Sequence, residues 1–301
     1  MLPSEGHGGT ITVKKSDYLL FFPFFAMVFI FLVFFIAWTA GISFTDWTGV
    51  YPSYNFAGIS AYEGVVGVSS FQRASINTLV FVGAGVPLLI ASGLLVAVTI
   101  DLLPNGMSSS IMKTVAILSF GLAQAITGVL WGWIFNPAQG VINSILDSIG
   151  LGGISQSFLT DPYLVILAIL ITLIWRFSGY TGVVFYGAIS SVPVSHREAA
   201  RIDGASIFQI YRYVLFPEIR GIILMFSLLL SMMVIKTFGI IWTMTGGGPG
   251  VASMIFPVLI YRRMFSAFNF AQGAAAAMIF LAIIMLFAVP YIYFQYKEGE
   301  L

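Results

Sequence analysis

The stretch Ser195–Pro217, SHREAARIDGASIFQIYRYVLFP, is a polar segment between two long apolar stretches, and it predicts a pair of short helices. Ser195-x-x-Glu198 and Ser206-x-x-Gln209 both fit the capping box that opens an α-helix. Gly204 lies between them, where a helix can end in a left-handed residue. Pro217 is expected to stop the second helix, because proline cannot donate the backbone hydrogen bond.

The chain on both sides of this segment is almost free of charge. Of its 301 residues, 59% are hydrophobic and only 8% are charged, against about 25% charged in soluble domains. A membrane span needs about 20 apolar residues. The sequence therefore predicts an all-α membrane protein with six transmembrane helices, at Tyr18–Phe44, Ala74–Ile100, Thr114–Leu146 (apolar to about Phe135), Pro162–Ser190, Gly221–Met244 and Met264–Tyr296.

The first span is too long for a cleaved signal peptide, whose apolar region has roughly 7–15 residues, so we expect a retained helix. Lys and Arg favour cytoplasmic flanks. If the N-terminus is in the cytoplasm, eight of these residues lie in the cytoplasmic segments that flank the spans and three lie in the outer segments. This distribution predicts that both termini are cytoplasmic. The eight are Lys14, Lys15, Lys113, Arg197, Arg201, Arg212, Arg220 and Lys297, and the three are Arg73, Arg262 and Arg263.

Several classes of function are disfavoured by composition. The chain has no cysteine and two distant histidines, His7 and His196, so thiolate chemistry and a histidine metal cluster are not expected. A net charge of +1 offers no basic stripe for nucleic acid. No glycine precedes a lysine, so the phosphate-binding loop of nucleotide hydrolases is absent from the sequence. We expect a subunit that is not an enzyme and binds no cofactor itself.

The segment Glu198-Ala199-Ala200, three residues, Gly204, nine residues, Val214-x-Phe216-Pro217 resembles the EAA signature of binding-protein-dependent ABC importer permeases. Six stretches of the third span and the outer segments resemble the sugar branch of maltose and glycerol-phosphate type, in particular the first of its two paired permeases. They are Ser43–Trp47 with Asn55–Tyr62, Trp131–Pro137 with Gly140–Asn143, Gly150-Leu151, and Thr245–Pro249. The chain departs from that branch at Gly239, often acidic in relatives, and at Ala123-Gln124, a region that often holds proline.

The resemblance implies the type I ABC importer transmembrane fold in a prokaryotic cell membrane. Residues 1–72 would form the N-terminus, first helix and outer segment, and residues 73–296 the permease core with a cytoplasmic coupling loop at 191–217. The implied partners are a second permease, two cytoplasmic ATPase subunits that use ATP and Mg, and an extracytosolic solute-binding protein that delivers a sugar. The implied ATPase-coupling residues are Glu198, Ala199, Ala200, Asp203, Gly204 and Pro217.

Polar and aromatic residues within the spans are candidates for the translocation path. Arg176 either lines the path or pairs with helix carbonyls or a neighbouring subunit, because a charge at membrane depth is costly. Lys236, expected near the outer half of the fifth span, either contacts the substrate or reaches toward water. Sugars need hydroxyl partners and flat apolar faces, although tryptophan also gathers at membrane interfaces. The remaining candidates are Gln124, Trp131, Trp133, Trp175, Trp242 and Thr243, with Asn77 weaker.

Three alternatives remain open at this stage. The first is a glycerol-phosphate-type permease, although a phosphate ligand favours several arginines near the path and only Arg176 qualifies. The second is a secondary transporter, which usually needs an acidic residue at membrane depth. The third is a non-transporting scaffold or receptor, which would be expected to carry a sizeable soluble domain.

The charge distribution generates a topology prediction. Single cysteines are informative because the native chain has none. In intact cells, a cysteine replacing Gly250 should react with an impermeant maleimide, and one replacing Gln209 should react only after the membrane is opened. The opposite pattern would overturn the predicted orientation.

Overall fold

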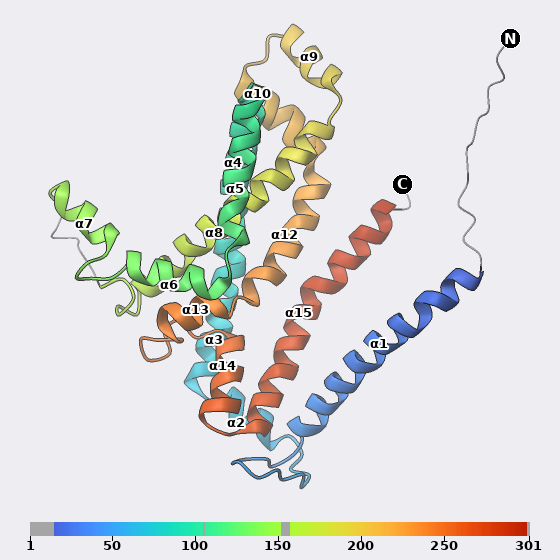
Figure 1. Cartoon of the computed structure of the whole chain (residues 1–301), viewed down its shortest axis with the longest axis vertical. Coiled ribbons are helices and arrows are strands. Elements are labelled where there is room, and N and C mark those ends of the chain that lie inside the picture. The colour runs from blue at the N-terminus through green and yellow to red at the C-terminus, as the bar shows by residue number, and fades with distance from the viewer. Residues whose placement is uncertain (1–14, 105, 152–156, 300–301) are drawn as a thin grey trace.

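The computed structural model describes residues 15–104, 106–151 and 157–299, and the described part is helical with two isolated β-bridges (Figure 1). Lys14 and His7, used in the sequence interpretation, lie outside the described residues. Four helices are long and apolar enough to cross a membrane. They are α1 (Lys15–Ser43), α3 (Ser69–Val80) continued through the π-helix η1 (Phe81–Gly85) into α4 (Val86–Leu102), α8 (Leu164–Ser191) and α15 (Phe270–Gly299). These confirm the first, second, fourth and sixth predicted spans.

The third predicted span is not one continuous helix, which corrects the sequence interpretation. It consists of α5 (Met107–Gly121) and α6 (Gln124–Ile134), which meet at 94°. Leu122 and Ala123 between them are extended, with ψ of 144° and 142°. Hydropathy reports only that a stretch is apolar, so it could not reveal this bend.

The fifth predicted span is also divided. The helix α12 (Arg220–Ile235) ends before Lys236, and α13 (Gly239–Thr245) follows as a separate helix. On its other side α12 meets the segment Ile207–Glu218 at 72°. The prediction that Lys236 lies inside a continuous helix was therefore wrong: its side chain is exposed at the break. Counting each bent pair as one span gives up to six spans in the described chain, in agreement with the predicted number.

Short helices gather at the two ends of the molecule (Figure 1). At one end, called the α9 end, α9 (Val194–Ile202) projects beyond the long helices. At the opposite end, called the α2 end, the helices α2 (Ser60–Val66) and α14 (Phe256–Tyr261) lie near the start of α15. The remaining short elements are α7 (Val141–Ser148), α10 (Ile207–Ile210), η3 (Tyr211–Leu215), α11 (Phe216–Glu218) and η4 (Arg262–Ser266).

The core lies where α4 packs along α8. Gly182 of α8 admits the Val96 side chain so closely that an added Cβ would overlap it, and Gly93 of α4 admits Thr181 in the same way. Fully buried side chains such as Phe185 fill the space around this contact. In contrast, α1 contacts α15 only near the α2 end in Figure 1, and its phenylalanines from Phe22 onward are largely exposed. Such a surface is stable against lipid or another apolar subunit.

The two half-helices α6 and α13 lie side by side between the two ends of the molecule (Figure 1). Gly128 of α6 faces Ile240 and Thr243 of α13, and a Cβ on Gly128 would come within 2.7 Å of the Ile240 carbonyl oxygen. Small residues allow helix backbones to approach this closely inside membranes.

Gly128→Ala should therefore destabilise the fold, because overpacking of a tight contact typically costs about 1–3 kcal/mol. Gly132→Ala is the matched control on the same helix, since a Cβ at Gly132 would meet nothing within 4 Å. Alanine there should be neutral or stabilising by up to about 1 kcal/mol, because it is the better helix former. Thermal unfolding of the two purified variants in detergent measures the difference, and equal midpoints would contradict the packing argument.

Candidate coupling segment and translocation site

The helix α9 begins two residues earlier than the Ser195 capping box predicts. Its N-cap is Pro193, no side chain caps it, and Ser195 already lies inside the helix. The predicted Ser195–Glu198 capping box was therefore wrong, because Pro193 has taken the capping position. Glu198 and Ala199 are exposed along α9, and Ala200 is half-buried. The carboxylate of Glu198 and the small side chain of Ala199 are therefore accessible to a partner protein.

The turn after α9 confirms the predicted role of Gly204. Its φ is +78°, the Ala205 N–H donates to the Ala200 carbonyl at 2.9 Å, and the Gly204 N–H donates to the Arg201 carbonyl at 3.1 Å. This is the Schellman arrangement, which needs a left-handed residue. The exposed Asp203 is the last residue before Gly204 and forms the C-cap of α9.

The following helix confirms the second capping box. The Ser206 N–H donates to Gln209 Oε1 at 2.7 Å, and the Gln209 N–H donates to Ser206 Oγ at 3.4 Å. The helix then continues through η3 and α11 to Glu218, so Pro217 does not stop it as predicted. The π-helical turn η3 lies directly before α11, in which Pro217 occupies the first turn.

An ionic anchor that the sequence analysis missed ties α9 to the second span. Arg197 Nη1 donates to Asp101 Oδ2 at 2.9 Å, and its Nη2 donates to the Ile189 carbonyl at 2.9 Å. The Tyr211 hydroxyl donates to the same Asp101 oxygen at 2.5 Å. Burial and this hydrogen bond raise the pKa of Tyr211 well above its usual range, so the hydroxyl stays protonated and donates. The sequence signal that could have predicted this anchor is an acidic residue, Asp101, at the end of the second span, together with the basic residues of the 191–217 segment.

Arg176 is buried at the bend between α5 and α6. Its Nη1 donates to the Leu122 carbonyl at 2.8 Å and to Thr127 Oγ1 at 2.9 Å. Its guanidinium also lies over the rings of Phe120 and Phe177, 5.6 and 5.8 Å from their centroids. Leu122 is the C-cap of α5, so Arg176 satisfies a carbonyl that the broken helix leaves free.

Gln124 and Thr243 join α6 to α13. Gln124 Oε1 accepts from the Gly239 N–H at 3.0 Å, which pairs a backbone donor in the first turn of α13. Thr243 Oγ1 donates to the Gly239 carbonyl at 2.8 Å and also lies 3.2 Å from the Ala125 carbonyl. Both candidate path residues therefore contribute to the contact between the two half-helices.

The tryptophans divide into packed and cavity-lining residues. Trp131 packs edge-on against Trp175 with centroids 5.7 Å apart, and Trp242 lies against Tyr261 at 4.6 Å. Trp133 is 71% exposed. Trp133 and Thr243 share a cavity of about 440 Å³ beside the α6–α13 contact, which is also lined by Val129, Gly132, Leu159 and Met244.

Asn77, a weaker path candidate, is buried at the α2 end, where its Nδ2 donates to the Ala252 and Met254 carbonyls at 2.8 Å each. It fixes the segment that follows the predicted outer turn at Thr245–Pro249. Among the described residues, no three His, Asp or Glu side chains gather where they could hold a metal ion.

The contacts of Arg176 generate a test of its role. Arg176→Leu should lower the thermal midpoint and the yield of assembled complex, because an unpaired buried polar group costs about 1–3 kcal/mol. Thr127→Val removes the hydroxyl that accepts from Arg176 and donates to the Ala123 carbonyl. The double variant should be less destabilised than the sum of the two. Full assembly of Arg176→Leu with loss of uptake would instead place Arg176 in the translocation path.

Comparisons with known proteins agree with this architecture. Residues 54–296 match the family model described as binding-protein-dependent transport system inner membrane component. A probable ABC transporter permease of Pyrococcus horikoshii is 36% identical over 94% of this chain and 96% of its own length. A xylose/arabinose import permease of Haloferax volcanii is 31% identical over 86% of this chain and 81% of its own.

The fold also matches a solved structure. A chain of a bacterial ABC transporter involved in the import of the acidic polysaccharide alginate superposes with a TM-score of 0.75 at 21% identity, over 95% of this chain and 97% of that one. The family match and the two permease relatives support one conclusion. This chain belongs to the binding-protein-dependent transport system inner membrane components, the multi-pass permeases of ABC transporters.

Proposed function

We propose that this chain is a permease subunit of an ATP-driven importer that translocates a sugar delivered by an extracytosolic binding protein. The observation that carries the proposal is the exposed helix α9, which the Arg197–Asp101 ion pair joins to a membrane span. Relatives named as xylose/arabinose and trehalose/maltose permeases support a sugar as the substrate. ATP and Mg are used by two partner ATPase subunits in the cytoplasm.

On this proposal, α9 is the contact to one ATPase subunit. Glu198 supplies an exposed negative charge and Ala199 an exposed small surface that another backbone can approach closely. Asp203, Gly204 and the helix through Pro217 fix the direction in which α9 projects. Closure of the ATPase dimer then moves α9, which is hydrogen-bonded to α4 and α8 through Arg197. This supports alternating access, which needs rigid elements that move together.

The cavity beside α6 and α13 is the candidate substrate contact. It combines an exposed indole, Trp133, with the hydroxyl of Thr243, which suits the flat apolar face and the hydroxyls of a sugar. None of the described residues that line it is an arginine or lysine, which favours a neutral sugar over glycerol phosphate. On this proposal Gln124, Trp131, Trp242 and Arg176 hold the walls of the path, and Lys236 lies at its edge.

The exposed apolar side of α1 fits the remaining partners, which are lipid and a second permease subunit. The proposal keeps both termini and the 191–217 segment in the cytoplasm, so that α9 and the ATPase subunits lie on the same side.

The coupling role can be tested in the reconstituted complex by measuring binding-protein-dependent sugar uptake and ATP hydrolysis. Glu198→Ala should lower uptake per assembled complex at least about tenfold, because a charged contact at the centre of an interface costs 2–5 kcal/mol when truncated. Gly204→Val should act similarly, since a β-branched residue at φ +78° is strained by about 1–2 kcal/mol or more.

Matched controls separate coupling from folding. Asp147→Ala removes an exposed acid from α7, which has no ion pair with α9 in the described chain, and should leave uptake near the wild-type value. Gly204→Asn should retain most activity, because asparagine tolerates the left-handed conformation. Normal uptake and normal hydrolysis in both Glu198→Ala and Gly204→Val would refute the coupling role, whereas an inactive wild-type complex would refute the transport function itself.

A further inference from the structure

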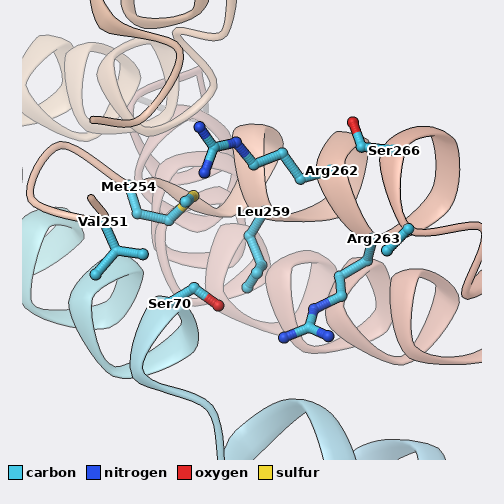
Figure 2. A pocket seen from close by; sticks show the side chains of 8 residues that line it. Ser70, Val251, Met254, Leu259, Arg262, Arg263 and Ser266 are labelled. Carbon is cyan, nitrogen blue, oxygen red and sulfur yellow. The ribbon is translucent and has the colours of Figure 1, made fainter. Parts of the chain in front are cut away.

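A second cavity lies at the α2 end, far from α9 along the chain's long axis. It has a volume of about 410 Å³ and is bounded by α3, the 251–254 segment and η4. Figure 2 shows the guanidinium groups of Arg262 and Arg263 on opposite sides of Leu259, with Ser70 and Met254 along the facing wall. In the sequence, the two arginines indicate only the orientation of the spans.

The two arginines are not neutralised within the described chain. Its two ion pairs, His196–Glu218 and Arg197–Asp101, both lie at the α9 end. Arg263 Nη1 donates to Gln272 Oε1 at 3.1 Å, a neutral partner. The guanidinium of Arg262 donates no hydrogen bond to residues 15–104, 106–151 or 157–299. The cavity therefore holds two positive charges with no negative charge within salt-bridge distance.

The walls of this cavity are held in place before any partner arrives. Asn77 fixes the carbonyls of Ala252 and Met254, and Leu259 is 1% exposed. The turn after η4 is closed by the Asn269 N–H, which donates to the Arg263 carbonyl at 2.8 Å. A preformed site loses less entropy on binding than one that must be ordered.

We propose that this arginine cavity receives an acidic side chain of the extracytosolic binding protein and so forms part of its docking site. The proposal rests on the proposed function, which places the α2 end outside the cell. The apolar walls made by Val251, Met254 and Leu259 match the aliphatic stem of a glutamate, and the guanidinium of Arg262 matches its carboxylate. Arg263 adds a second positive charge on the other side of Leu259. Arginine forms paired hydrogen bonds with carboxylates.

A protein partner accounts for this site better than the transported sugar. The cavity shares no lining residue with the cavity at Trp133 and Thr243, so it is separate from the candidate substrate contact. The cavity is bounded by the first turn of α3 and by the segment before α15. These elements lie at the α2 end of the molecule, which a soluble docking protein would reach (Figure 1). Membership of a binding-protein-dependent family requires such a docking surface.

The test measures ATP hydrolysis by the reconstituted complex in phosphatidylcholine nanodiscs while the ligand-loaded binding protein is titrated. Arg262→Glu should raise the half-saturating concentration of binding protein at least about tenfold, because like charges at an interface cost several kcal/mol. Arg73→Glu is the matched control, since Arg73 is an exposed arginine of α3 that does not line the cavity. It should shift that concentration less than twofold. A lysine at the matching acid of the binding protein should restore docking to Arg262→Glu.

Five results would overturn the proposal. An unchanged half-saturating concentration in Arg262→Glu would show that the cavity is not a docking site, and an equal shift in Arg73→Glu would indicate general surface charge. A defect that appears only when anionic lipid is added would assign the arginines to lipid phosphate. A defect that persists at saturating binding protein would assign them to a later step. A wild-type complex that the binding protein does not stimulate would instead refute the proposed function, and the docking site with it.

Discussion

Backbone groups freed by a broken helix must find partners inside an apolar environment, and this constraint shapes the middle of the chain. The bend at Leu122 and Ala123 frees a carbonyl at the end of α5, and Arg176 donates to it. The start of α13 frees an N–H at Gly239, and Gln124 accepts from it. Side chains from one element thus pair the backbone of another, and the bent spans are stable only as a packed unit.

Side-chain contacts also connect the proposed coupling helix α9 with the proposed substrate site at α6 and α13. Arg197 on α9 is hydrogen-bonded to Asp101 at the end of α4 and to a carbonyl of α8. The helix α4 packs along α8, and α8 carries Arg176, which holds the bend between α5 and α6. The chain of contacts from α9 to the α6–α13 pair is therefore continuous. Each step in it is a helix or a contact between helices, which is the property that a mechanical coupling requires.

Local signals in the sequence predicted local features well. Charge-free length located the continuous spans, Gly204 predicted a left-handed residue, and Ser206 with Gln209 predicted a capping box. The Ser195 capping box failed because α9 begins earlier, with Pro193 at its N-cap, so that Ser195 already lies inside the helix. The bend at Leu122 follows Gly121, the last residue of α5, but a single glycine in an apolar stretch does not predict a bend of 94°. The partner of the bend, Arg176, is 54 residues away along the chain.

The candidate site shows the same division, since the exposed residues of α9 were predictable and the residues that hold the site together were not. Glu198 and Ala199 are exposed and form part of a short local pattern. The contribution of Asp101 depends on Arg197, 96 residues later, and on Tyr211, 110 residues later. Pairings over such distances leave no periodic trace in one sequence.

The two departures from the family pattern lie at the same contact. Gly239 replaces a residue that is often acidic in relatives, and Ala123-Gln124 occupies a region that often holds proline. A Cβ at Gly239 would lie 2.8 Å from the Gln124 Cβ and 3.2 Å from the Ala125 nitrogen, so only glycine fits beside this glutamine. Gln124 in turn accepts from the Gly239 N–H, an interaction that this glycine makes sterically accessible. The two departures are therefore one structural feature: a side chain at position 239 would require α6 to lie farther from α13, and the acceptor for the first turn of α13 would have to come from elsewhere.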